Sequence, residues 1–440
     1  MKTNPKSKIQ NPNQTHNRKL RVIGIWAVAA CIALQGTCLA AQQKDNCAAC
    51  HAGVDAKQAA IVNGYKTDIH FLKGITCAGC HGGDVTKTDE DAMDPEKGFS
   101  GAPKHLEIPT MCGKCHSDAN FMRHYNPALN VDQEEKYYTS VHGQKLKQGD
   151  QKVATCISCH GVHGILPADN TSSPVHKLNI PKTCAKCHGD KQYMAGYGIP
   201  TNQFEEYSQS VHGVALLEKQ TKGAPACNDC HGNHGAAPPG VNDVAAVCLT
   251  CHALNGDLFN QSPHKEAFQA KGISQCAACH NHHLVMHPTD AWLGVNEGAV
   301  CVKCHTSGDK GFAAAAQMKF ILDSLINGQQ RVKTALGKAQ ALDMDVSEGE
   351  SAIEDIREKT IEARTAIHAA SVAHLLDVTK DGFTSEAKAE SLATAAVHEH
   401  AFRRAGFGVA TLVITGLALL LWLKIRAIER RQKRTMSDER

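Results

Sequence analysis

Cysteine and histidine recur in this sequence at one fixed spacing. The string Cys-x-x-Cys-His occurs nine times, and in each copy the histidine directly follows the second cysteine. Two thiols at this spacing can form thioethers with the two vinyl groups on one edge of a haem. The histidine lies about one helical turn from the first cysteine, on the same face, where it can bind the iron. The motifs therefore predict nine covalently attached haem c groups.

The motifs use 18 of the 20 cysteines in the chain. The cysteines expected to bind haem are Cys47, Cys50, Cys77, Cys80, Cys112, Cys115, Cys156, Cys159, Cys184, Cys187, Cys227, Cys230, Cys248, Cys251, Cys276, Cys279, Cys301 and Cys304. The histidines expected to be the first iron ligands are His51, His81, His116, His160, His188, His231, His252, His280 and His305. A zinc site, a thioredoxin-like pair or a disulfide framework would explain one cysteine pair, but not nine pairs that all precede histidine.

The motifs are parts of larger repeats. Ser-Val-His-Gly occurs at 140–143 and 210–213, and a further histidine stands three residues after the motif histidine in Cys-His-Gly-Val-His-Gly, Cys-His-Gly-Asn-His-Gly and Cys-His-Asn-His-His. Together these elements define a two-haem module. A histidine precedes its first motif, another follows that motif, and a second motif closes it. The modules span 68–116 (a degenerate copy without the trailing histidine), 140–188, 210–252 and 262–305, and the motif at 47–51 stands alone.

A histidine that keeps its place in each module is well placed to be the sixth ligand of an iron. Two further candidates stand in Pro-x-His elements ahead of two of the motifs. The nine candidates are His70, His105, His142, His163, His176, His212, His234, His264 and His283. Bis-histidine ligation fills both axial positions, so the iron can change charge but cannot bind a substrate. Which histidine reaches which iron cannot be read from their order.

Composition points to an unusual core. Aromatic residues make up only 5% of the chain, and residues 41–311 hold few large apolar side chains. Such a segment needs another source of buried apolar surface, which flat haem groups would supply. We therefore expect a mainly α-helical protein with much irregular structure, in which 41–311 is a haem-packed multihaem cytochrome c body.

Both ends of the chain carry membrane signals. Basic residues, an apolar run and small residues make 1–40 a predicted signal peptide, although an uncleaved anchor stays open. Residues 405–423 contain no charge and are long enough to cross a bilayer as one helix. The basic tail 424–440 should then be cytoplasmic. We therefore expect a single-pass protein of the inner membrane, with the haem body on the periplasmic or extracytoplasmic side.

Between the haem body and the apolar segment, 312–404 contains no cysteine or proline and has helical apolar spacing. We expect a helical hairpin or bundle of three helices, the last of which enters the membrane. The predicted breaks lie at 344–350 and at Asp381-Gly382. Histidines at 368, 374, 398 and 400 are most simply surface or interhelical residues, but one of them could bind a haem that folds back onto the bundle.

The motif array, the Ser-Val-His-Gly and Cys-His-Gly-x-His-Gly elements and the single C-terminal span resemble those of membrane-anchored multihaem cytochromes c. This broad group includes the tetrahaem cytochromes of sulfate reducers and the octahaem hydroxylamine-oxidoreductase-like proteins. The resemblance implies a nonahaem electron carrier between a membrane quinol pool and periplasmic or extracellular acceptors. The Cys-x-x-Cys-Lys motif of the pentahaem nitrite reductases is absent. The quinol-oxidising tetrahaem family is usually anchored at its N-terminus, which puts direct quinol oxidation in doubt.

Two functions remain. The first is electron transfer, with no catalytic residue and with other cytochromes or a membrane quinol-oxidising protein as partners; no nucleic acid is expected among them. The alternative is a multihaem oxidoreductase in which one open haem acts on a small nitrogen or sulfur compound. Because candidate histidines are at least as numerous as irons, electron transfer is the favoured function.

Overall fold

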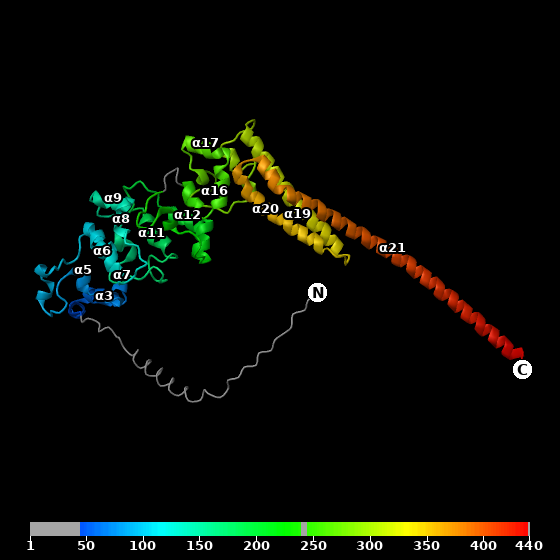
Figure 1. Cartoon of the computed structure of the whole chain (residues 1–440), viewed down its shortest axis with the longest axis horizontal. Coiled ribbons are helices and arrows are strands. Elements are labelled where there is room, and N and C mark those ends of the chain that lie inside the picture. Colours follow the sequence, from blue (N-terminus) through cyan, green and yellow to red (C-terminus); the bar gives the residue numbers. More distant parts are fainter. Residues whose placement is uncertain (1–44, 239–243, 439–440) are drawn as a thin grey trace, which may run out of the picture. The chain divides into compact units, whose positions relative to one another are not determined.

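The computed structural model of the chain describes residues 45–238 and 244–438 (Figure 1). These residues form helices and loops, with no strand among them. The mainly helical fold predicted from the sequence is therefore confirmed. The predicted signal peptide lies outside the described residues. The chain divides into two compact units, the first made of described residues up to 137 together with 142–174, and the second of 138–141 with the chain from 175 onward. The boundary thus falls inside the segment 41–311 that the sequence treats as one body.

The first unit consists of short helices separated by loops. In chain order they are α2 (Asn46–His51), α3 (Ala56–Tyr65), α4 (Ile69–Leu72), α5 (Cys77–His81), η1 (Glu90–Met93), η2 (Pro95–Lys97), η3 (His105–Glu107), α6 (Ile108–His116), α7 (Ala119–Arg123), α8 (Gln133–Thr139), α9 (Val141–Lys147) and α10 (Cys156–His160). The end of α8 and the start of α9 cross the boundary between the units. Four of these helices, α2, α5, α6 and α10, contain a haem motif, so each motif of this unit is helical.

The second unit begins in the same style and ends in long helices. Its short elements are α11 (Ile180–His188), α12 (Gln203–Gln209), α13 (Val211–Gly213), η4 (Val214–Glu218), α14 (Cys227–His231), α15 (Val244–Leu249), α16 (Ala253–Asn260), α17 (Pro263–Lys271), α18 (Gln275–His280), η5 (Asp290–Trp292), η6 (Cys301–Lys303) and η7 (Ile367–Ala369). Its long helices are α19 (Lys310–Gln340), α20 (Ser347–Ala366) and α21 (Val372–Asp438).

Six of the nine motif helices end in one of two ways. In the first motif of each module the helix stops at the histidine, and the next residue has positive φ: Gly82 (69°), Gly161 (76°), Gly232 (82°) and Asn281 (63°). Glycine and asparagine are the residues that tolerate this conformation. Two of the second motifs instead end longer helices, α6 and α11, which begin with Ile-Pro and have proline in the first turn, where its missing N–H costs nothing. The chain therefore turns sharply after first motifs, which brings the trailing segment back beside the motif histidine.

Helices α19, α20 and α21 pack together as a three-helix bundle with a conventional apolar core. Leu322, Leu325, Ile356 and Leu375 are fully buried there. Ion pairs also link the helices at their surfaces, such as Lys388 with Glu348 at 2.9 Å. The bundle thus has the apolar side chains that the motif-bearing segments lack.

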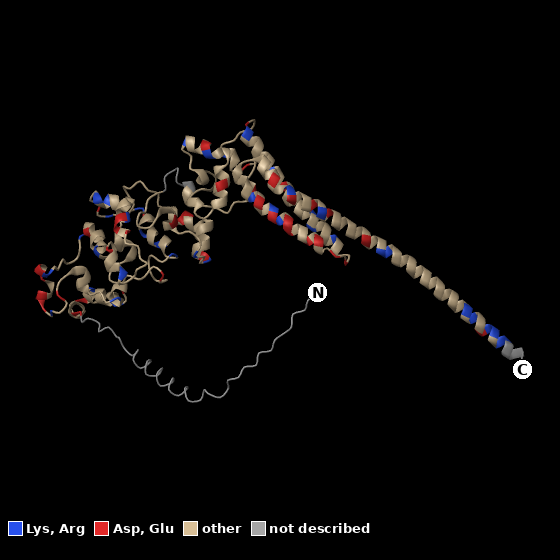
Figure 2. Ribbon diagram, in the orientation of Figure 1, with Lys and Arg blue, Asp and Glu red and all other residues tan. Residues whose placement is uncertain are grey.

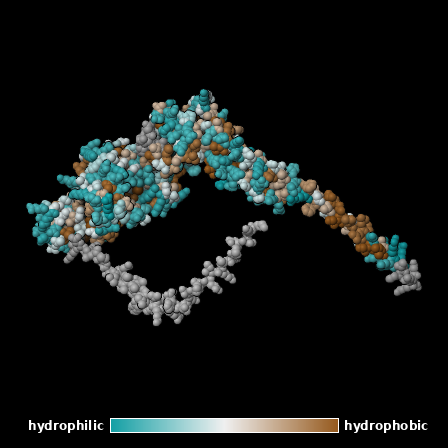
Figure 3. All heavy atoms as spheres, viewed as in Figure 1, coloured by the Kyte–Doolittle hydropathy of each residue, from teal (hydrophilic) through white to brown (hydrophobic). Residues whose placement is uncertain are grey.

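The last helix continues far beyond the bundle. Its apolar part is wholly exposed and long enough to cross a membrane, the one such helix in the described residues. Figure 3 shows this apolar stretch, followed by a hydrophilic end where Figure 2 shows clustered basic residues. Exposure matters, because the core helix of a soluble protein would bury such a surface. A single C-terminal candidate span is therefore present, as the sequence predicted.

One predicted helix boundary is wrong. The expected break at Asp381-Gly382 lies inside α21, and the chain instead turns at Ala370, whose φ is 48°. Gly382 serves close packing: a Cβ at this position would lie 3.0 Å from Leu325 and 3.0 Å from Lys359 of the neighbouring helices. The glycine therefore permits helix contact and does not end the helix.

Candidate haem-binding site

None of the 18 motif cysteines, all of which lie in the described residues, is paired in a disulfide. Consecutive motifs pack in pairs: α6 with α10, α11 with α14, and α15 with α18. In each pair the two first cysteines share a hydrogen bond, which raises the pKa of Cys112, Cys184 and Cys248 and lowers the pKa of Cys156, Cys227 and Cys276. The second motif of one module therefore lies against the first motif of the next.

Motif histidines face other histidines across a nearly constant gap. Several such pairs are seen in the part of the chain that the structure describes. They are His70–His116 (ring centroids 6.0 Å apart), His81–His163 (6.1 Å), His212–His252 (6.3 Å), His231–His283 (6.0 Å), His264–His305 (6.0 Å) and His280–His368 (6.1 Å). Metal–imidazole bonds are about 2.0–2.1 Å long, so imidazoles on opposite sides of one metal place their centroids roughly 6 Å apart.

The angles between the paired rings vary although the distances do not. The ring planes of His280 and His368 meet at 17°, whereas those of His70 and His116 meet at 86°. Axial ligands can rotate about the line that joins them through the metal, which leaves their mutual angle free and their separation fixed. No group of three or more metal-binding side chains occurs in the described residues. Two histidines alone suit a metal whose other ligands come from a porphyrin.

Second hydrogen bonds orient the paired rings. The Nδ1–H group of His81 donates to Gly101 O at 2.8 Å, and that of His231 donates to Ala237 O at 3.2 Å. His305 uses its Nδ1 toward the Asp309 carboxylate at 3.1 Å. Ligating histidines typically donate their other N–H to a carbonyl or carboxylate. With Nδ1 engaged in this way, the Nε2 atom is left for the iron.

Among these Nδ1 hydrogen bonds, that of His70 has the most firmly held partner. Its Nδ1 lies 2.8 Å from the carboxylate of Asp68, which is 2% exposed and also accepts from the backbone N–H groups of His70 (2.9 Å) and Ile165 (2.7 Å). Burial acts to raise the pKa of Asp68, but the hydrogen bonds outweigh it and hold that pKa below its ordinary value. An ionised carboxylate therefore holds the His70 ring.

The surroundings of several paired histidines lower their pKa. Burial first, and then the neighbouring histidine, lowers the pKa of His163, His212, His264 and His280. Burial and His231 do the same to His188. A histidine must be unprotonated at the binding nitrogen to bind a metal. These environments therefore favour the form that a haem iron needs.

The nine predicted second ligands lie in different surroundings, and only some of them face a motif histidine. Five of them face a motif histidine: His70, His163, His212, His264 and His283. His142 and His234 occupy equivalent places in their modules, and their assignment stays a prediction.

The two Pro-x-His candidates lie in other surroundings. The Nε2 atom of His105 lies 2.9 Å from Val153 O, and His176 is 4% exposed and accepts from Leu178 N through Nδ1 at 3.4 Å. Among the described residues, neither ring is paired with a motif histidine. With its Nε2 atom engaged, His105 has the reverse of the arrangement seen in the paired rings.

One paired histidine was not among the predicted ligands. His368, in η7 between α20 and α21, faces His280 of the eighth motif. It lies outside every repeat, so no sequence pattern distinguishes it from the other histidines of the bundle.

Comparison with known proteins gives one distant relative. The chain is 23% identical over 226 residues to the C-type polyheme cytochrome OmcC of Geobacter sulfurreducens, an alignment that covers 48% of this chain and 26% of that protein. The matched part is thus about a quarter of the relative's length. No family model and no solved structure matches the chain. The likeness supports the class that the motifs and paired rings indicate, a c-type cytochrome with several haems.

Proposed function

We propose that this chain is a membrane-anchored nonahaem cytochrome c that transfers electrons through bis-histidine haems. The observation that carries the proposal is the set of histidine pairs with centroids 6.0–6.3 Å apart and freely varying ring angles. When bound, haem supplies reversible one-electron chemistry at iron. The protein's part is to attach the haems through the motif cysteines, hold them with two histidines and keep them close together.

Closeness of successive haems is supported by contacts between motifs. Cys77 N–H donates to the Asp45 carboxylate at 2.8 Å, and burial together with Asp45 raises the pKa of Cys47, so one side chain joins the first two motifs. The first-cysteine sulfur atoms, which lie within hydrogen-bonding distance of each other, bring the third motif next to the fourth, the fifth next to the sixth and the seventh next to the eighth. Haems attached at neighbouring thiols would be close enough to exchange electrons.

Anchoring is proposed from the C-terminal helix. Its apolar residues are open to the surroundings, for example Leu412 (75% exposed) and Leu420 (64% exposed). The basic residues after it favour a cytoplasmic C-terminus by the positive-inside rule. The haems would then lie outside the cytoplasmic membrane, where other cytochromes or a membrane quinol-oxidising protein are the expected partners.

The proposal is tested by haem content and spin state in the full chain. Acid-stable haem should number nine per chain, and the ferric protein should be predominantly low-spin, because two histidines fill the axial positions. Carbon monoxide should bind to none of the haems. A protein without covalent haem, or one with several high-spin haems, would contradict the proposal.

The alternative function, an oxidoreductase with one open haem, fits the first motif best. The Nδ1 atom of His51 is buried and has no hydrogen-bond partner, whereas paired motif histidines such as His81 use theirs. Among the described residues, no second histidine ring lies against His51. At this haem, a small nitrogen or sulfur compound would bind to the open axial position of the iron.

Carbon monoxide separates the two functions. In the electron-transfer case it leaves the spectrum unchanged. In the alternative, it should bind to one haem per chain, and replacing both Cys47 and Cys50 with alanine should remove that haem and its carbon monoxide binding while eight haems stay low-spin. Nitrite or hydroxylamine turnover that disappears in the same variant would establish catalysis.

A further inference from the structure

Within the four modules, the repeat leaves His280 without a partner from another module. In the described units, His81 of the first module faces His163 of the second, and His231 of the third faces His283 of the fourth. In these two modules, the histidine of the first motif thus faces the trailing histidine of the next module. The fourth module has no successor, so the same rule supplies nothing for His280.

The structure places His368 in that position. Its ring centroid is 6.1 Å from that of His280, at the same distance as the other pairs, and the rings are nearly parallel. The Nδ1–H group of His368 donates to Thr365 O at 2.9 Å, the arrangement that leaves Nε2 for a metal in the other paired histidines. The turn that carries His368 ends at Ala370, whose φ of 48° is costly for a residue with a Cβ.

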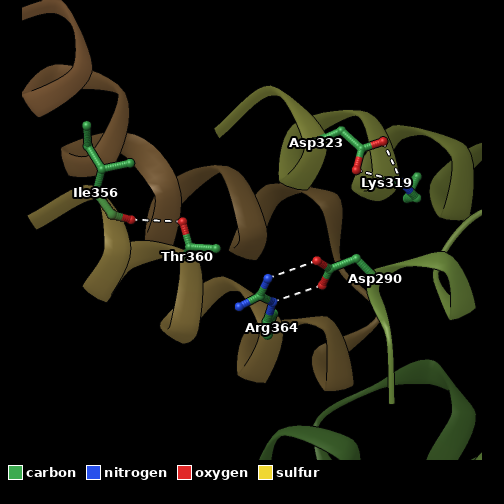
Figure 4. Close-up of polar contacts among 6 residues, drawn as sticks. All are labelled: Asp290, Lys319, Asp323, Ile356, Thr360 and Arg364. Atoms are coloured by element: carbon green, nitrogen blue, oxygen red, sulfur yellow. Dashed lines mark hydrogen bonds and ion pairs between the residues drawn. The ribbon is translucent and has the colours of Figure 1, made fainter. Parts of the chain in front are cut away.

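Other contacts hold this part of the bundle in place. Arg364, one turn before His368, forms a two-pronged ion pair with Asp290, both N–O distances being 2.8 Å (Figure 4). The Trp292 ring lies 5.7 Å from that of His280. Leu293 is buried in the core that also holds Leu322 and Leu375 of the bundle. These contacts therefore fix both His368 on the bundle and His280 on the motif, with their rings facing each other.

We propose that His368 is the second axial ligand of the haem at Cys276–His280, so that an iron bond ties the helical bundle to the cytochrome body. The inference rests on the proposed function, because it requires a haem at this motif. It adds a ligand from outside the repeats and ties the turn that bears His368 to the haem at the last module. The last module is completed by the bundle, as the first and third are completed by their successors.

The test is the spin state of the full-length His368→Gly protein. One haem per chain should become high-spin and bind carbon monoxide, with all nine haems still covalently attached. Added imidazole should return that haem to low spin, because it replaces the missing ligand. His374→Ala, a change three residues into α21, should leave the spectrum as in the wild type.

The possible outcomes separate this inference from the proposed function. A wild-type protein without covalent haem would contradict the proposed function. A low-spin wild type whose spectrum His368→Gly does not change would overturn this inference alone. Should the glycine variant fail to mature, His368→Met keeps a ligand of similar size and should raise the potential of one haem. Unchanged potentials in that variant would equally overturn the inference.

Discussion

The motif-bearing segments and the three-helix bundle are stabilised in different ways. In the bundle, Leu325, Val332 and Ile356 are fully buried in a continuous apolar cluster. In the cytochrome body, the apolar cluster around Leu216 has only two further buried members, Ala224 and Ala226. Burial of apolar surface is the main favourable term in folding. We therefore expect the bundle to fold on its own side chains and the cytochrome body to depend on bound haem.

The largest expected effect comes from withholding haem. Full-length protein produced without haem attachment should lose the protease resistance of residues 45–309. Without haem, this region has too little buried apolar surface to stay folded. The bundle should stay helical, which circular dichroism and the protease-resistant fragment would show. Equal resistance of the two regions without haem would remove the contrast between them.

A core substitution should affect the bundle alone. Leu325→Ala removes a fully buried side chain, and we expect a loss of about 2–5 kcal/mol in the free energy of unfolding of the bundle. The haem absorbance should not change. Phe320→Ala is the matched control, since Phe320 is 73% exposed on the same helix and its loss should cost less than about 0.5 kcal/mol. Similar losses for the two variants would argue against this core.

Within the cytochrome body, a charge next to a ligand should tune one haem. Asp68→Asn removes the buried carboxylate that accepts from His70, so the oxidised iron loses a stabilising negative charge. The potential of one haem should rise in a redox titration. Asp84→Asn, which removes an exposed carboxylate of the same unit bonded to Thr86, should leave all potentials in place. A rise in both variants would point to a general charge effect.

The smallest effect concerns the ion pair beside His368. Hydrogen bonding to Arg364 lowers the pKa of Asp290, so the pair stabilises the folded state above about pH 4 and this contribution is lost as pH falls through the lowered pKa. The pair is partly exposed, and Arg364→Ala should cost about 0.2–1 kcal/mol at neutral pH. Thermal unfolding of variant and wild type should converge in acid. Arg357→Ala, which breaks an exposed pair within α20, should show a smaller difference.

The sequence predicted the motifs, the modules and the helical class because covalent haem attachment demands fixed residue types at fixed spacing. It could not predict the pairing of ligands. The partner of His81 lies in the following module, and the loop that brings it back depends on the positive φ of Gly82 and on the fold of the whole unit. His105 was predicted from its recurrence, yet its Nε2 atom faces a backbone carbonyl.

In the bundle too, local sequence patterns do not predict features that depend on tertiary packing. Apolar periodicity predicts its three helices. It also predicts a helix end at Gly382, where the glycine instead allows close packing. The real turn at Ala370 carries no glycine or proline. His368 owes its position to this turn, so the missed boundary and the missed ligand have one cause.

The unbroken course of α21 sets a length scale. Its first residue, Val372, follows the turn that bears His368, and residues 372–404 precede the apolar stretch. At about 1.5 Å per residue these residues extend for roughly 50 Å. The haem at His280 would then stand at a fixed height far above the bilayer, beyond the reach of any quinol within it. The long helix would make the chain a relay that receives electrons from a carrier tall or mobile enough to meet it there.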